Sequence, residues 1–378
     1  MTKYKLGEII ELNPRESIKK GNIARKIAMD DLGEFKRDIE SYSYSEYKGG
    51  TKFRNYDTLM ARITPCLENG KTSFVNILEE NEVAFGSTEY FVFRAKQDII
   101  NPYYLYYLVT TDKFREVAIK SMSGTSGRQR VQKDQILDFS VDLPSLEDQE
   151  KIMKPLKLID DKISLNTKLN TNLNSLLECV FNNYYHHKND TVSTKLELIS
   201  EVRSANRIFA KEYRNEGIPF LRGKEISLLS QGNSPTDTLF ISIEKYKKLK
   251  NIPKAKDILV TSVGTIGNIY QVENFRLPFY YKDGNIIQIT PHKGFENYIY
   301  LWLNSKFGDK EIVSATIGST QKALTISAIK KFKLYILNNH ELQRFNHIVY
   351  PLIKQIQQNH EENDFLQDLK STLLKRYF

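Results

Sequence analysis

The chain has 378 residues, more than one hydrophobic core usually organises, so we expect two or more domains. With 40% hydrophobic and 27% charged residues, it has the composition of a folded protein and not of a disordered one. The excess of 55 Lys and Arg over 46 Asp and Glu gives a formal charge of +9, which favours a polyanionic partner.

The pattern of the chain argues against membrane and secreted classes. No apolar run approaches the roughly 18 residues that span a bilayer, and the first residues lack the apolar core of a signal peptide. We therefore expect a cytoplasmic protein that does not enter a membrane. Cys66 and Cys179 lie far apart without a CxxC partner, so we expect neither a disulfide framework nor a metal site.

The first 144 residues are predicted to form a mixed domain. Short apolar runs alternate with Gly and Asn turns, which is typical of an α+β domain with several strands. One helix stands out and is predicted to begin near Pro102. Asn101 suits its N-cap, and Pro102 suits its first turn.

A long helix is predicted for residues 145–189. Apolar residues recur there at alternating spacings of four and three, the pattern of a coiled-coil seam. Asn166 and Asn170 interrupt this pattern at two consecutive seam positions. The apolar seam residues are Ile152, Leu156, Ile159, Ile163, Leu173, Leu177 and Val180.

The second half of the chain repeats the first at an offset near 193 residues, with Tyr107 falling on Tyr300 and Phe139 on Phe332. This predicts a second mixed domain over residues 190–338 and a second long helix over residues 339–378. The fold is then α+β, with two similar globular α/β domains separated by two long helices and related by a pseudo-twofold. The seam of the second helix reads Leu352, Ile356, Asn359, Asn363, Leu366 and Leu373.

The asparagines suggest how the helices pair. A buried Asn at a seam position costs stability but fixes register, because a mis-registered partner leaves its amide unsatisfied. We therefore predict an antiparallel coiled coil whose register is set by Asn166, Asn170, Asn359 and Asn363. The alternative is that these side chains face solvent on ordinary surface helices.

Two loops carry the candidate binding residues. GTSGRQRV (124–131) and GSTQKALT (318–325) both open with Gly and small hydroxyl residues and pass through a Gln beside a basic residue. A guanidinium fork suits guanine or phosphate, and an amide suits adenine. The alternative is that the loops only cap the next element. The predicted DNA contacts are Ser126, Arg128, Gln129, Arg130, Ser319, Thr320, Gln321 and Lys322.

These motifs carry a resemblance to a known family. Together with DILVTSVGTIGNIY (257–270), GIPFLRGKEI (217–226) and LPSLEDQEKI (143–152), they resemble the specificity (S) subunit of Type I restriction-modification systems. The order of globular domain, long helix, globular domain and long helix is similar too, and the resemblance covers the whole chain.

The resemblance implies a division of labour. Each globular part would be a target recognition domain that reads one half of a split, asymmetric sequence in double-stranded DNA. The coiled coil would set the unread gap and dock two copies of the adenine methyltransferase (modification) subunit, with restriction translocase subunits joining outside. The chain itself would be non-catalytic and would need no cofactor.

Three other functions remain open at the level of sequence. The chain could be a self-sufficient methyltransferase, a protein-binding coiled-coil adaptor that reads no DNA, or the DNA-recognition part of another methyltransferase system. Asn101 and Pro102 resemble part of the (Asn/Asp)-Pro-Pro-aromatic motif of adenine methyltransferases, but the second Pro is missing. VGTIG (263–267) lacks the full spacing of a dinucleotide-binding loop and is interpreted as a strand-to-strand turn.

Overall fold

The computed structural model describes residues 2–125, 127–186, 192–235, 237–316 and 322–378, which form two compact units. The first unit comprises the residues up to Leu165 together with Leu366–Phe378, and the second comprises Asn166–Phe365. Each unit thus includes part of both long helices. The predicted boundaries at residues 144, 189 and 338 instead treated each helix as a region separate from the globular domains. The difference arises because seam side chains also pack against the nearest globular elements.

The strands of the first unit form three sheets. One four-stranded sheet has the order β2-β9-β6-β7, a second has the order β4-β3-β8-β5, and β1 pairs with β10. The bounds are β1 Thr2–Lys5, β2 Ile10–Leu12, β3 Ile23–Ile27, β4 Ser43–Glu46, β5 Thr51–Phe53, β6 Thr58–Ala61, β7 Thr72–Phe74, β8 Ala84–Gly86, β9 Tyr90–Ala95 and β10 Ser140–Leu143.

Short helices cover these sheets, and one of them begins where the sequence predicts. The Asn101 side-chain oxygen accepts hydrogen bonds from the backbone N–H groups of Tyr103, at 2.9 Å, and Tyr104, at 3.4 Å. Asn101 therefore caps the helix, which confirms the structural interpretation of the Asn-Pro pair. The helices are α1 Leu6–Ile9, α2 Pro102–Thr110, α3 Asp112–Lys120 and α4 Lys133–Leu137.

The second unit has the same plan. Its sheets have the orders β12-β18-β15-β16, β14-β13-β17 and β11-β19. The strands are β11 Val192–Lys195, β12 Ser200–Ser204, β13 Ile218–Leu221, β14 Leu239–Ile241, β15 Ile258–Thr261, β16 Ile269–Gln271, β17 Tyr280–Tyr281, β18 Ile286–Pro291 and β19 Lys333–Ile336. The helices are α6 Gly223–Ser230, α7 Ile243–Lys247, α8 Glu296–Leu303, α9 Lys306–Ala315 and α10 Ile326–Lys330.

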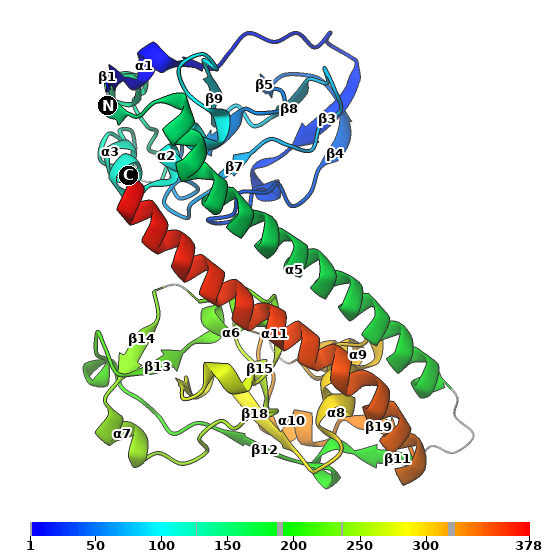
Figure 1. Ribbon diagram of the computed structural model, residues 1–378. Coiled ribbons are helices and arrows are strands. Elements are labelled where there is room, and N and C mark those ends of the chain that lie inside the picture. The colour runs from blue at the N-terminus through cyan, green and yellow to red at the C-terminus, as the bar shows by residue number, and fades with distance from the viewer. Residues whose placement is uncertain (1, 126, 187–191, 236, 317–321) are drawn as a thin grey trace. The chain divides into compact units, whose positions relative to one another are not determined.

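The element order confirms the predicted duplication of an α+β domain (Figure 1). The four-stranded sheets β2-β9-β6-β7 and β12-β18-β15-β16 match strand by strand. The sheets β4-β3-β8-β5 and β14-β13-β17 each contain one parallel pair, β3 with β8 and β13 with β17. Helix α10 begins 193 residues after α4, at the offset found in the sequence.

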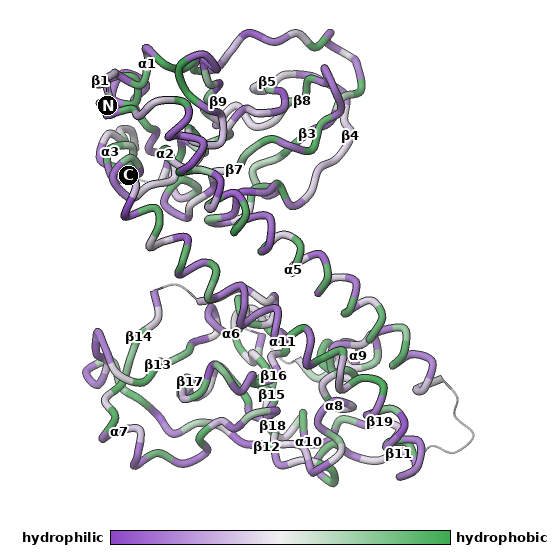
Figure 2. The backbone as a smooth tube through the Cα atoms, in the orientation of Figure 1, coloured by the Kyte–Doolittle hydropathy of each residue, from purple (hydrophilic) through white to green (hydrophobic). Residues whose placement is uncertain are grey.

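The two long helices are α5 (Leu146–His186) and α11 (Asn339–Tyr377), close to their predicted bounds. Figure 2 shows hydrophobic and hydrophilic residues alternating along α5, as expected for a helix with an apolar seam. No helix within the described ranges is long and apolar enough to cross a membrane.

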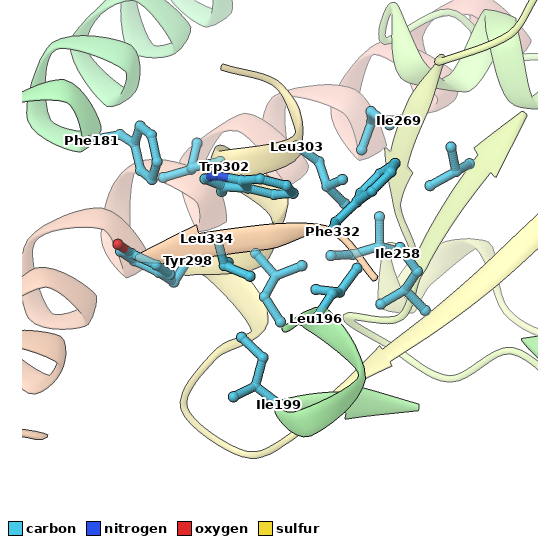
Figure 3. Packing of buried hydrophobic residues seen from close by; sticks show 14 of the residues in the cluster. Phe181, Leu196, Ile199, Ile258, Ile269, Tyr298, Trp302, Leu303, Phe332 and Leu334 are labelled. Carbon is cyan, nitrogen blue, oxygen red and sulfur yellow. The ribbon is translucent and has the colours of Figure 1, made fainter. Parts of the chain in front are cut away.

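The core of the second unit joins α5 to the globular elements (Figure 3). Trp302 and Tyr298 of α8 are fully buried among side chains of β19, β15 and α5. The Trp302 Nε1–H donates a hydrogen bond of 3.2 Å to the Tyr185 hydroxyl of α5, so the only indole of the chain is both packed and satisfied.

Within the second unit the long helices run antiparallel, as predicted, and the seam asparagines meet. The Asn166 amide donates to the Asn363 side-chain oxygen at 2.9 Å, and the Asn359 amide donates to that of Asn170 at 2.6 Å. All four side chains are buried. The solvent-facing alternative is therefore wrong, while their effect on register stays a prediction.

Within the first unit, the end of α11 packs on α5 and α2. Leu373 and Phe378 lie against a cluster that includes Leu156. The Lys370 ammonium donates to the Asp160 carboxylate at 2.7 Å, and the same carboxylate accepts from the Tyr107 hydroxyl at 2.8 Å. Because Asp160 is buried, these two donors are needed to satisfy its charge.

The Asn170–Asn359 pair predicts an energetic coupling. Asn170→Leu leaves the buried Asn359 amide without this partner, so we expect it to lower the free energy of unfolding by about 1–3 kcal/mol. The double change Asn170→Leu with Asn359→Leu should cost less than the sum of the single changes. Denaturant unfolding of the full-length chain measures this, with Asn174→Leu on the exposed face of α5 as control. Strictly additive costs would contradict the coupling.

Candidate nucleic-acid interface

The first predicted loop is closed by backbone pairing. Ser123 and Arg130 exchange two backbone hydrogen bonds, of 3.0 and 2.9 Å. Gly124 has a positive φ of 131°, and a Cβ added there would lie 3.1 Å from the Arg128 carbonyl oxygen. The loop therefore needs Gly at this position to fold back on itself. This geometry supports the loop-shaping alternative for the backbone and leaves the side chains available.

The loop presents its polar side chains unequally. Arg128 is exposed, and Gln129 is half-buried. The Gln129 backbone is fixed by Thr64, whose hydroxyl accepts from the Gln129 N–H at 3.1 Å and whose N–H donates to the Gln129 carbonyl at 3.1 Å. Ser126 lies outside the described residues.

Arg130 belongs to an ion cluster that the sequence did not reveal. Its guanidinium grips the Glu89 carboxylate in a bidentate manner, with Nη2–Oε1 at 2.7 Å and Nε–Oε2 at 3.0 Å. The Arg62 Nε lies 3.2 Å from the same carboxylate. The hydrogen bonds from Arg130, opposed by burial and supported by Arg62, lower the pKa of Glu89 from its ordinary value. Two guanidinium groups therefore share one carboxylate at the base of the loop.

The second loop occupies the equivalent backbone position. The Leu324 N–H donates to the Ser262 carbonyl at 2.9 Å, as the Val131 N–H donates to the Arg62 carbonyl at 2.9 Å. Val263 forms a β-bridge with Ala323. Lys322 precedes this bridge and is exposed. The predicted contacts Ser319, Thr320 and Gln321 lie outside the described residues.

These pairings show which residues of the two loops correspond. Arg130 forms the β-bridge with Ile63 in the first unit, and Ala323 takes that place in the second. Lys322 is thus the counterpart of Gln129, and the two Gln-basic pairs are offset by one residue. The offset of 193 residues found in the sequence gives the same correspondence, and the strand-like pairing of the backbone confirms it.

At the equivalent described positions of the second unit, the ion cluster is absent. The Ser262 N–H donates to the Asn285 carbonyl at 2.8 Å, as the Arg62 N–H donates to the Glu89 carbonyl at 3.0 Å. The set Arg62, Glu89 and Arg130 is therefore replaced by Ser262, Asn285 and Ala323. The same backbone frame presents charged groups in one unit and small neutral groups in the other.

The remaining candidate motif is structural. VGTIG (263–267) connects the antiparallel strands β15 and β16, which confirms its interpretation as a strand-to-strand turn. Gly264 and Gly267 take positive φ values of 78° and 89° there. Among the residues that the structure describes, no group of three or more His, Cys, Asp or Glu could hold a metal ion.

Comparison with known proteins identifies the class. The family described as Type I restriction modification DNA specificity domain matches residues 1–175 and 189–367. The chain belongs to this family, and it contains two copies of the domain. This confirms the family resemblance found in the sequence.

Individual relatives are more distant. The specificity subunit of the Type I restriction enzyme HindI of Haemophilus influenzae is 30% identical over 179 residues, 46% of this chain and 37% of that protein. The EcoAI specificity subunit of Escherichia coli is 36% identical over 106 residues, 28% of this chain and 18% of that protein. The chain therefore matches well under half the length of these two relatives. The MjaIX specificity subunit of Methanocaldococcus jannaschii is 26% identical over 299 residues, covering 72% of this chain and 67% of that protein.

A solved structure shares the fold. The S subunit of the Type I restriction-modification system from M. genitalium matches with a TM-score of 0.60 and 17% identity, covering 100% of this chain and 96% of that one. At this identity the similarity concerns the fold alone.

The ion cluster predicts an effect of charge on DNA binding. Glu89→Gln removes the carboxylate that neutralises Arg62 and Arg130, so we expect the full-length chain to bind duplex DNA more tightly. The slope of log affinity against log salt should steepen by about one. Glu116→Gln, which removes the same charge from the exposed face of α3, serves as control. Equal salt slopes for the two variants would contradict the prediction.

Proposed function

We propose that the chain is the DNA-specificity subunit of a Type I restriction-modification enzyme and that each domain reads one half of a split, asymmetric target. The observation that carries the proposal is the pair of loops at equivalent backbone positions with different side chains. Each base pair presents its own donors and acceptors in the major groove, so different side chains select different bases. Two such readers in one chain suit a target with two unlike halves.

The proposed readers are the polar and basic residues in the sequences of the two loops. In the first domain they are Arg128, Gln129 and Arg130, with Ser126 beside them. Arg128 can contact guanine or phosphate directly, whereas Arg130 must share its guanidinium with Glu89. In the second domain the readers are Lys322 and the neighbouring Ser319, Thr320 and Gln321. None of these roles is catalytic, and methylation and cleavage belong to partner subunits.

The helices hold the readers in this proposal. A rigid spacer of constant register gives a constant unread gap between the two half-sites, and the paired asparagines supply that register. Half-sites read by related domains must follow the geometry of the DNA duplex. The gap length is then a property of the seam and not of the loops.

An exposed apolar stripe on α5 supports docking of partner subunits. Its leucines are 40–61% exposed and recur at spacings of seven, four and seven, so they share one face of the helix. At the offset of 193, Gln358 and Glu362 of α11 occupy the positions of two of them. An exposed apolar patch of this kind is typical of a protein interface. The stripe consists of Leu158, Leu165, Leu169 and Leu176.

We propose as its occupant the adenine methyltransferase subunit, present in two copies, with restriction translocase subunits outside. The complex would assemble in the cytoplasm on double-stranded DNA, and this chain would need no cofactor. A protein-binding adaptor that reads no DNA would use the same stripe, so the decisive difference is the sequence of the methylated DNA.

Co-expression with the adenine methyltransferase subunit of the same system tests the reading function. We expect methylated adenines, mapped at single-base resolution in the host genome, to fall in one split, asymmetric motif with a constant gap. An assembled complex that methylates DNA without such a motif would contradict the specificity role. Methylation by this chain alone would instead favour a self-sufficient methyltransferase.

The stripe predicts a change in assembly. Leu165→Gln together with Leu169→Glu gives α5 the side chains that α11 carries at the equivalent positions. We expect this variant to lose co-purification of the methyltransferase subunit by about tenfold or more, because leucines that the proposed interface would bury are replaced by polar groups that lack partners there. Lys154→Gln with Lys168→Gln, also on exposed positions of α5, is the control. Retention of the partner by the leucine variant would exclude this face as the docking site.

A further inference from the structure

An excess of basic residues lies beside the sheet β14-β13-β17 of the second unit. Two segments border this sheet, residues 206–216 before β13 and residues 242–256 after β14. Together they contain nine basic and three acidic residues, an excess of six in a chain whose total excess is nine. These two segments therefore contribute most of the net positive charge of the protein.

The second segment separates its apolar and basic residues. Tyr246, Leu249 and Ile252 recur every three residues. They pack into the hydrophobic cluster of the sheet β14-β13-β17, which includes Phe220 and Tyr280. The lysines between and after them point away from that cluster and are exposed. We define the lysine face as Lys247, Lys248, Lys250 and Lys254.

The lysine face is not neutralised within the chain. No ion pair joins its four side chains to an acidic group among the described residues. By contrast, the neighbouring Lys245 forms a 2.7 Å ion pair with Glu212. The Asn206 side chain accepts from the Lys250 N–H at 2.8 Å, which brings the exposed Arg207 close to the face as well. The four lysines of the face are thus exposed without an acidic partner among the described residues.

The first unit repeats the charge at the same topological place without repeating the sequence. Residues 13–22 before β3 and 47–56 after β4 contain six basic residues and one acidic residue. The Tyr47 N–H donates to the Asn22 carbonyl at 2.8 Å, so these two segments also touch. Lys19 and Lys20 are exposed there, whereas Lys48 and Arg54 form ion pairs with Glu46 and Glu16. An excess of positive charge on an unlike sequence favours a ligand that is recognised by charge.

We propose that the lysine face binds the phosphate backbone of the DNA, outside the bases read by the loops of the same domain, and that residues 13–22 and 47–56 do so in the first domain. This inference rests on the proposed function. Phosphate contacts carry no sequence information, but they fix the register and orientation of a reader on the duplex. Each domain then combines a reading loop that differs between the domains with a basic surface that binds the DNA backbone whatever its sequence.

The salt dependence of DNA binding tests the proposed phosphate contacts of the lysine face. The full-length chain, with its methyltransferase subunit, is titrated with a duplex of arbitrary sequence, because non-specific binding is almost entirely electrostatic. Replacing the four lysines of the face by Gln should reduce the slope of log affinity against log salt by roughly three to four, at about 0.9 per phosphate contact. Replacing them by Arg should leave the slope unchanged.

A matched variant removes the same charge elsewhere. Four exposed lysines of the same unit serve for this, namely Lys306 and Lys310 on α9, Lys331 just after α10, and Lys333 on β19. Their replacement by Gln should leave the slope close to that of the unaltered chain. Equal slopes for the two glutamine variants would overturn the lysine face.

Methylation mapping separates this outcome from failure of the proposed function. If the unaltered complex marks a split motif but the two glutamine variants have equal slopes, the reading function stands and the lysine face is wrong. If the unaltered complex marks no motif, the reading function fails, whatever the slopes. The expected result is an unchanged motif, methylated less completely by the lysine-face variant as salt rises.

Discussion

A buried amide must find a hydrogen-bond partner, and this constraint governs the helix seam of the second unit. Asn170 and Asn359 satisfy each other, as do Asn166 and Asn363. Sliding one helix by a heptad would place Asn170 opposite Leu352 or Leu366 instead of Asn359, and this is the basis of the predicted role of the asparagines in register. The same register decides which residues of α5 and α11 remain free to enter the core around Trp302. The globular fold and the helix pairing are therefore parts of one packing solution.

The duplicated frame explains how two domains can differ in chemistry while keeping one architecture. The contacts that position each loop, such as those of Val131 with Arg62 and of Leu324 with Ser262, join backbone atoms. Side chains at these positions can therefore change without loss of the pairing. An Arg-Glu-Arg cluster in one domain and small neutral residues in the other are both compatible with the frame. The side chains of the two loops can therefore differ without disturbing the backbone hydrogen bonds that hold the loops in place.

Much of the architecture could be predicted from the sequence because its signals are periodic. The heptad pattern predicted both long helices, although Pro155 and Pro351 lie inside them, since the apolar seam outweighs a missing backbone donor. The sheets β4-β3-β8-β5 and β14-β13-β17 were not predicted in detail, because their strands of two to five residues are too short to show a period.

The candidate site was harder to predict because it depends on contacts between distant segments. Glu89 lies 41 residues before Arg130 in the sequence, and nothing in its neighbourhood distinguishes it from other acidic residues. The one-residue offset between the two Gln-basic pairs, by contrast, follows from the repeat offset of 193 residues as well as from the backbone pairing.

The packing of Leu366–Phe378 within the first unit has a consequence for biosynthesis. These residues leave the ribosome about 200 residues after Leu165, yet the Phe378 ring lies 4.8 Å from that of Tyr104. Until they emerge, the aromatic cluster around α2 has an uncovered side, even though domains usually fold in the order of their synthesis. The first unit therefore gains this part of its packing only after the second domain has been translated.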